Sequence, residues 1–158
     1  MRKTLQLARF AAMAWLIIAM TISLAACRKI DPISAETFKD ETEKLGYTIV
    51  ENTDYYSGLG FVSKCYSLFD DAFSVDFFEI DSSDNAVSYY KTGKDYIKSE
   101  KSGVSSIVEA NTGAYSYYKQ KSGDKYYVII RVGTTMLYGM CPKTNAAQLD
   151  KFIKSIGY

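Results

Sequence analysis

The chain has 158 residues, of which 47% are hydrophobic and 23% are charged, and its formal net charge is +1. It contains no histidine, which excludes His-ligated zinc and every catalytic arrangement that uses histidine as the general base. The near-neutral charge argues against a nucleic-acid partner, because such partners are bound through an excess of lysine and arginine. The length suits one folded domain that follows an N-terminal segment.

The N-terminal segment has the pattern of a secretory signal, with positive charges, then an apolar run, then small residues before a cysteine. These features are Arg2, Lys3 and Arg9, the run from Phe10 to Met20, and Leu24-Ala25-Ala26-Cys27. The last four residues resemble the lipobox of bacterial prolipoproteins. The resemblance implies cleavage before Cys27, attachment of diacylglyceryl to its sulfur, and a lipid-anchored protein on the extracytoplasmic face of the cell membrane.

The alternative for this segment is a transmembrane helix that stays in the mature protein. The run from Phe10 to Ala26 is at the short end for a span of about 20 residues, so we favour a signal that is removed. We therefore expect a signal peptide over residues 1–26, a lipidated short tether over 27–33 and a single domain over 34–158. The tether reaches roughly 20 Å at most, which keeps the domain close to the membrane. Loss of the three basic signal residues leaves a formal charge of −2.

Three segments of the mature chain show helical periodicity or cap residues: 34–46, 83–99 and 145–157. Ser34 is expected to cap the first helix. Asn145 with Gln148 resembles a capping box at the start of the third. Gly93 lies inside the second helix, where it costs about 1 kcal/mol relative to alanine, so we expect close packing on a neighbour there.

The remaining periodic segments indicate β-strands: 47–52, 61–69, 73–80, 105–110, 114–120, 125–132 and 135–141. Ser122-Gly123-Asp124 favours a hairpin turn between two tyrosine-rich strands. Strands in runs, with helices at both ends and in the middle, predict an α+β fold. We expect an antiparallel β-sheet of about five to seven strands packed with an N-terminal, a middle and a C-terminal helix.

Two cysteines, Cys65 and Cys141, remain after Cys27 is used for the lipid. In an exported domain they either form a disulfide, which would stabilise by about 4 kcal/mol, or stay as two buried thiols. We favour the thiols slightly.

The charges are unevenly divided along the mature chain. Residues 28–90 have 5 basic and 13 acidic residues, a net of −8, and residues 91–158 have 11 basic and 5 acidic residues, a net of +6. Two interpretations are open. Either the halves pair with each other across one fold, or the molecule has an acidic face and a basic face.

Several motif coincidences carry no catalytic prediction. The patterns S-x-x-K, S-D-N and K-T-G of serine β-lactamases and penicillin-binding proteins occur within residues 83–93. One predicted helix cannot place them around a single nucleophile, as those enzymes require. Asp81, Ser83 and Asn85 match positions 1, 3 and 5 of a calcium loop, but Thr92 stands where the bidentate glutamate belongs. We predict no catalytic residue, metal or cofactor, and keep a carboxylate-driven envelope hydrolase only as a third hypothesis.

All 14 tyrosines lie in the mature domain. The candidate binding surface on the tyrosine-rich hairpin comprises Tyr115, Tyr117, Tyr118, Lys119, Lys121, Lys125 and Tyr126. Since adjacent strand residues face opposite ways, the outward rings are either Tyr115 and Tyr117 or Tyr118 and Tyr126. The competing interpretation is that the tyrosines reflect ordinary strand propensity in a half-buried sheet.

Two functions follow from this surface. The first is a non-catalytic interaction module whose partners are membrane lipid, through acylated Cys27, and an envelope or membrane protein. The alternative is a receptor for a small ligand or an anionic envelope polymer.

Overall fold

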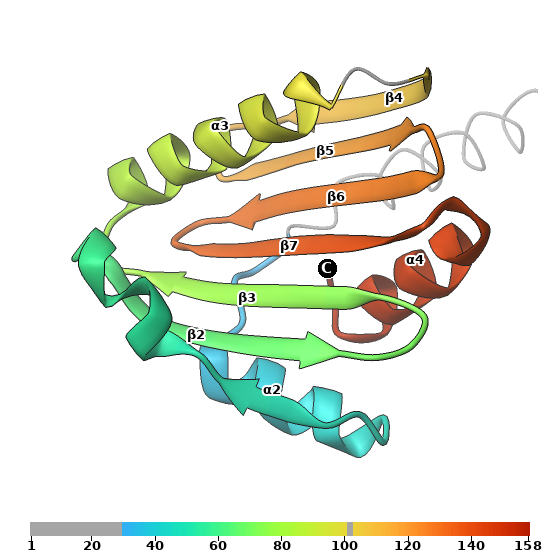
Figure 1. Ribbon diagram of the computed structural model, residues 1–158. Coiled ribbons are helices and arrows are strands. Elements are labelled where there is room, and N and C mark those ends of the chain that lie inside the picture. Colours follow the sequence, from blue (N-terminus) through green and yellow to red (C-terminus); the bar gives the residue numbers. More distant parts are fainter. Residues whose placement is uncertain (1–29, 101–102) are drawn as a thin grey trace, which may run out of the picture.

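Seven antiparallel strands form one sheet in the order β1-β2-β3-β7-β6-β5-β4 (Figure 1). The computed structural model describes residues 30–100 and 103–158, so the lipobox and Cys27 lie outside the described residues. The strands are β1 (Ile49–Glu51), β2 (Val62–Phe69), β3 (Ser74–Ile80), β4 (Val104–Asn111), β5 (Tyr115–Ser122), β6 (Lys125–Val132) and β7 (Thr135–Pro142). The predicted α+β class and antiparallel sheet are confirmed.

The helices cover both faces of the sheet. α2 (Ala35–Lys44) and α4 (Ala146–Ser155) pack on one face, where Phe38, Leu149 and Phe152 join a core with β3, β6 and β7. α3 (Ser83–Ser99) packs on the other face through Ala86, Tyr90 and Ile97 (Figure 1). None of the helices in the described part of the chain has the length and apolarity needed to cross a bilayer.

The central strand β6 explains why both faces need a helix layer. Val128 and Ile130 belong to the core beneath α2 and α4, whereas Tyr127 and Ile129 belong to the core beneath α3. Burying an apolar side chain of this size stabilises by about 1.5–3 kcal/mol, so neither face of β6 can be left in water.

Of the two helix caps that were predicted, one is confirmed and the other is wrong. Ser34 caps α2 as predicted, since its Oγ accepts a hydrogen bond from the Thr37 amide at 3.1 Å. The capping box predicted at Asn145 is wrong. A short 3₁₀ turn, Lys143–Asn145, precedes α4, and the Asn145 side chain donates to the Ala72 carbonyl at 2.9 Å. This bond ties the start of α4 to the β2–β3 turn instead of closing the helix end.

Gly93 of α3 makes the close approach expected from its place in the helix. A Cβ added to Gly93 would lie 2.5 Å from Cδ1 of Ile129 on β6. The helix therefore sits on the sheet at a distance that only glycine permits.

A 3₁₀ segment, Thr53–Leu59, lies between β1 and β2, where neither a strand nor a helix was predicted. It places the ring of Tyr56 edge-on against Phe78 of β3, with 4.9 Å between ring centroids. The first strand is shorter than predicted because Tyr47 leaves the sheet and packs on Phe73 and Phe152.

The two described cysteines are free thiols, so the disulfide alternative does not match the structure. Cys65 on β2 lies in the core beneath α3, and Cys141 on β7 lies in the core beneath α2 and α4. Since β3 lies between β2 and β7, the strands that carry the thiols are about 10 Å apart. A disulfide needs Cα atoms within about 7 Å and side chains that point toward each other.

Among the residues that the structure describes, no ion pair joins the acidic half of the chain to the basic half. Four ion pairs join described residues: Glu41–Lys44, Glu51–Lys64, Lys94–Glu109 and Lys119–Asp150. Each of them lies within one half. The interpretation that acids of the first half pair with bases of the second therefore finds no support among the described residues.

A candidate binding cleft between the terminal helix and the sheet edge

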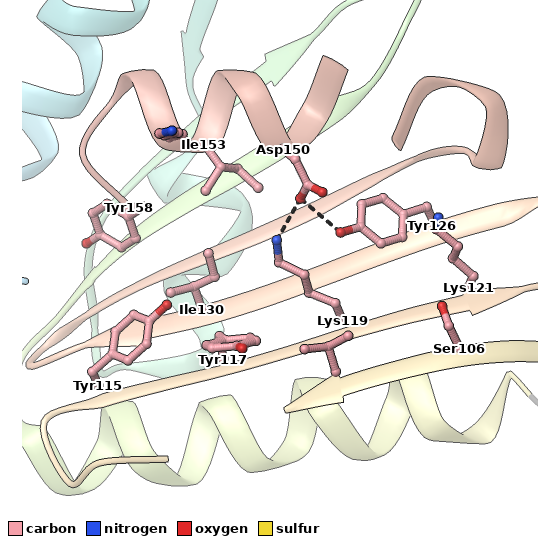
Figure 2. Close-up of a pocket in the computed structure, with 12 residues that line it drawn as sticks. Ser106, Tyr115, Tyr117, Lys119, Lys121, Tyr126, Ile130, Asp150, Ile153 and Tyr158 are labelled. Carbon is pink, nitrogen blue, oxygen red and sulfur yellow. Dashed lines mark hydrogen bonds and ion pairs between the residues drawn. The ribbon is translucent and has the colours of Figure 1, made fainter. Parts of the chain in front are cut away.

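A cleft of about 610 Å³ lies between α4 and the β5–β4 edge of the sheet (Figure 2). It exists because α4 packs on β7, and none of the helices within residues 30–100 and 103–158 packs over the same face of β5 and β4. The sheet forms its floor and α4 forms one wall. A volume of this size is typical of sites for small molecules or for short segments of a polymer.

Alternate side chains of β5 supply most of the floor of the cleft. Tyr115, Tyr117, Lys119 and Lys121 follow one another on the cleft side, while the residues between them point toward α3. Residues two apart on a strand are about 6.6 Å apart, so the four side chains extend over about 20 Å. Two aromatic positions are thus followed by two basic positions along one line.

Five of the seven predicted surface residues line this cleft: Tyr115, Tyr117, Lys119, Lys121 and Tyr126. The first predicted alternative, Tyr115 and Tyr117, is confirmed, and the second is right for Tyr126 alone, which lies on the same side of the sheet. The hairpin register explains this, because Lys121 of β5 pairs directly with Tyr126 of β6. Directly opposed residues of an antiparallel pair share a face.

Tyr118 and Lys125 do not line the cleft, so their assignment to the binding surface is wrong. Tyr118 is fully buried beneath α3, where its hydroxyl donates to Gln120 Oε1 at 2.6 Å. Burial raises the pKa of this phenol. Lys125 is exposed at the turn between β5 and β6 and borders a second, smaller cleft at the β2–β3 turn.

Asp150 of α4 links the wall of the main cleft to its floor. Its Oδ1 accepts hydrogen bonds from Lys119 Nζ at 2.7 Å and from the Tyr126 hydroxyl at 2.9 Å, as Figure 2 shows. Burial of the phenol and its bond to this carboxylate together raise the pKa of Tyr126 above its usual range. Tyr126 is therefore a neutral hydrogen-bond donor at every physiological pH.

The end of the cleft near Tyr115 is mainly aromatic and aliphatic. The rings of Tyr115 and Tyr117 are tilted against each other with 5.7 Å between centroids, and Ile130 and Ile153 lie beside them (Figure 2). Tyr158 closes this end. Its hydroxyl contacts Thr135 Oγ1 and the backbone of Ile33, and burial raises the pKa of its phenol.

The cleft has a net positive charge. Lys119, Lys121 and Lys154 line it together with one carboxylate, that of Asp150. Among the described residues only Lys119 of the three lysines has an ion-pair partner. The Lys121 amine lies 5.7 Å from the centroid of the Tyr126 ring, a distance that suits a cation–π contact. Two ammonium groups are thus available to an anion.

The sequence did not point to the α4 residues of the cleft. Asp150, Ile153 and Lys154 belong to a helix whose apolar stripe predicts core packing, and nothing in their spacing shows which strand they face. The only signal is that Asp150 and Lys154 are charged residues at i and i+4, on a line beside the buried stripe.

Asp81, which matches the first position of a calcium loop, and Asp70 of the β2–β3 turn both have local structural roles. Asp81 accepts from Asn85 Nδ2 at 2.8 Å at the start of α3, where the Ser82 hydroxyl caps the helix. Asp70 accepts from the Ala72 amide in the β2–β3 turn. No group of three or more potential metal ligands occurs among the residues that the structure describes.

The sequence matches no protein-family model, and no curated protein matches it. In three dimensions the chain is similar to the crystal structure of a GTP binding regulator from Thermotoga maritima, with a TM-score of 0.51. The match covers 80% of this chain and 88% of that chain, at 15% sequence identity. A likeness at this identity shows the fold alone.

Proposed function

We propose that this protein is a membrane-anchored extracytoplasmic lipoprotein that acts as a non-catalytic binding module. Its binding site is the cleft between α4 and the β5–β4 edge, called the Tyr/Lys cleft after the tyrosines and lysines that line it. The observation that carries this proposal is the cleft itself. Its aromatic, basic and carboxylate side chains come from two separate parts of the chain, β5–β6 and α4, and meet around an open volume of about 610 Å³. Tyrosine suits such a surface because it covers a large area with few rotatable bonds.

The chain that would connect the domain to its anchor is short. Ile30 and Ile33 already pack against the core beneath α2 and α4, and Pro32 lies beside Gly133. With Cys27 acylated, only Arg28 and Lys29 would separate the lipid from the folded domain. Three residue steps reach about 10 Å, so the domain would sit directly on the membrane surface. Arg28 and Lys29 would then favour anionic headgroups.

Two kinds of partner suit such a module. The first is an envelope or membrane protein within reach of the anchored domain. The second is a small ligand or an anionic envelope polymer, which makes the protein a receptor. The concave form of the site and its net positive charge favour the second, because protein partners are more often met by flat surfaces of about 800 Å² per side.

The anchor is tested by labelling cells with an alkyne-bearing fatty acid and comparing the wild type with Cys27→Ala. We expect the label on the wild type alone, and we expect the variant to leave the washed membrane fraction. A wild type that is unlabelled, or a Cys27→Ala protein that stays in the membrane at the wild-type level, contradicts the proposed anchoring.

The binding site is tested in intact cells with a photocrosslinking amino acid at Tyr117 in the cleft. The matched control carries the same amino acid at Tyr96, which is 57% exposed on α3, on the opposite face of the sheet. We expect a discrete crosslinked species from position 117 and only scattered abundant neighbours from position 96. Equal patterns from the two positions would contradict the assignment of the cleft.

A further inference from the structure

We propose that the occupant of the Tyr/Lys cleft is an acidic glycan, a chain of sugar rings that carries phosphate or carboxylate groups. This inference rests on the proposed function, in which the cleft is the binding site, and adds the chemical class of the ligand. Three features of the cleft support it: the order of side chains along the floor, the net positive charge and the kinds of polar group that line it.

The side chains on the floor of the cleft change from aromatic to basic along β5. The half-buried rings of Tyr115 and Tyr117 lie at one end, and the amines of Lys119 and Lys121 follow on the same strand (Figure 2). Sugar rings present a face of C–H groups that packs against aromatic rings, while their anionic substituents pair with ammonium groups. A length of about 20 Å along β5 accommodates roughly four sugar units, each about 5 Å long.

The polar groups of the cleft suit a ligand that brings hydroxyls and anions. Lys121 and Lys154 supply ammonium donors, Tyr126 supplies a phenol that stays neutral, and Asp150 supplies carboxylate oxygens that accept from hydroxyls. Ser106 of β4 adds a hydroxyl at the outer rim.

The same polar groups do not suit an extended peptide. β5 is paired along its whole length with β4 on one side and β6 on the other. Its backbone N–H and C=O groups are therefore engaged within the sheet. An extended peptide in the cleft would leave its own backbone groups without partners, which is unfavourable wherever those groups are buried.

A nucleobase would also meet few partners in this cleft. Base edges are read most often by bidentate contacts from amide side chains or arginine, and less often by a carboxylate or a hydroxyl. The described residues that line the cleft include no asparagine, glutamine or arginine. A base stacked on a tyrosine would find only the Asp150 carboxylate and the Ser106 hydroxyl for its edge, and neither makes the bidentate contact that identifies a base.

The aromatic end of the cleft lies next to the chain that leads to the proposed anchor. Tyr158 closes that end, and its phenol is hydrogen-bonded by the backbone of Ile33, six residues after Cys27. A glycan attached to the membrane or lying on it would thus be within reach of the cleft.

The test measures binding of full-length protein, kept in a detergent without a sugar headgroup, to immobilised tetra- to hexasaccharides. The panel contains phosphorylated, carboxylated and neutral oligosaccharides of matched ring number, with tetraglutamate, inorganic tetraphosphate and GTP as soluble competitors. The cleft variants are Tyr117→Ser and Lys121→Ala. Lys125→Ala is the matched control, because it removes the same charge from the same hairpin outside the cleft.

We expect at least one acidic oligosaccharide to bind ten-fold or more tightly than its neutral counterpart. Either cleft variant should weaken that binding by ten-fold or more, whereas Lys125→Ala should change it less than two-fold. The phosphorylated and carboxylated members distinguish the two sources of charge. The native protection of Cys65 and Cys141 from thiol reagents checks that each variant is folded.

Three results would overturn the inference. The first is that no acidic oligosaccharide binds more tightly than the neutral ones, and the second is that any of the soluble competitors (tetraglutamate, tetraphosphate or GTP) displaces the glycan as well as the free glycan does. The third is that Lys125→Ala weakens binding as much as Lys121→Ala. The proposed function fails separately. A protein that is anchored and crosslinks through position 117, yet binds no acidic glycan, keeps its function as a binding module and loses only this ligand.

Discussion

Lys119 on β5 and Asp150 on α4 form an ion pair of 2.7 Å that joins the floor of the cleft to its wall. The side chains are 27% and 42% exposed, so the pair contributes little to folding, about 0–1 kcal/mol. Its main consequence is electrostatic. The carboxylate neutralises one of the three lysines of the cleft and holds the Tyr126 hydroxyl at the same oxygen.

Asp150→Asn should therefore increase the affinity of the cleft for acidic oligosaccharides, by roughly three- to ten-fold. The amide keeps an oxygen that accepts from Tyr126 but no longer neutralises Lys119. Titrations at two salt concentrations check this, because the gain should shrink as salt screens the freed charge. The free energy of unfolding in urea should change by less than about 1 kcal/mol. Weaker binding by the variant would mean that the carboxylate itself is required by the ligand.

A half-buried carboxylate on the opposite face of the sheet, that of Asp76, should make stability depend on pH. Burial raises the pKa of Asp76, although the Ser67 hydroxyl donates to it at 2.6 Å. The folded protein thus holds this proton more strongly than the unfolded chain, whose pKa is near 3.9. Ionised Asp76 destabilises the fold, and this cost develops as the pH rises through the unfolded and then the folded pKa.

Asp76→Asn should for this reason raise the free energy of unfolding at pH 7, because the amide oxygen still accepts from Ser67 without a charge. The advantage should disappear near pH 3, where Asp76 of the wild type is protonated. Urea titrations at the two pH values measure it. Asp71→Asn in the exposed β2–β3 turn is the control and should change stability by no more than about 0.5 kcal/mol. An Asp76→Asn protein that is less stable at pH 7 would show that the charge is favourable.

The two buried thiols should be unreactive in the native protein. Burial raises the pKa of Cys65 to about 12 and that of Cys141 to about 11. A disulfide-exchange reagent at pH 8 should find no fast-reacting thiol in folded Cys27→Ala protein and two thiols after unfolding without reductant. Two unreactive sulfurs after unfolding would instead indicate a disulfide, which contradicts their places on opposite faces of the sheet.

Gly93→Ala should destabilise the protein by up to about 2 kcal/mol, although alanine is the better helix former. The new Cβ would lie 2.5 Å from Cδ1 of buried Ile129, and overpacking of this kind costs about 1–3 kcal/mol. The higher helix propensity of alanine offsets about 1 kcal/mol of that cost.

Chemical unfolding of the single variants Gly93→Ala and Ile129→Val, and of the double variant, measures the coupling between the two positions. Valine lacks the clashing methyl, so the double variant should be more stable than the sum of the single changes predicts. Additive effects would show that α3 moves away from the sheet at no cost.

The sequence was sufficient to locate most elements, because each depends on local signals. Periodicity and cap residues placed α2, α3 and α4, and the Gly123 turn placed the β5–β6 hairpin. The start of α4 was misread because Asn145 bonds to Ala72, which is 73 residues away in the sequence. Such a long-range contact leaves no local pattern.

The cleft could be predicted only in part for the same reason. Strand alternation places Tyr115, Tyr117, Lys119 and Lys121 on one face, but it does not say which face α4 covers. Tyr118 was misplaced since its ring is as consistent with a binding surface as with a core until the position of α3 is known. Asp150 was missed because its partner Lys119 is 31 residues away, on the strand that the helix leaves open.

The assignment of the cleft is tested most directly by nuclear magnetic resonance of the isotope-labelled full-length protein in micelles, titrated with the acidic oligosaccharide panel. We predict that amide signals of residues 115–121 and 150–154 shift in a saturable way, while those of residues 69–74 at the second cleft do not. Saturable shifts confined to residues 69–74, or no saturable shift in residues 115–121, would contradict the assignment of this cleft as the binding site.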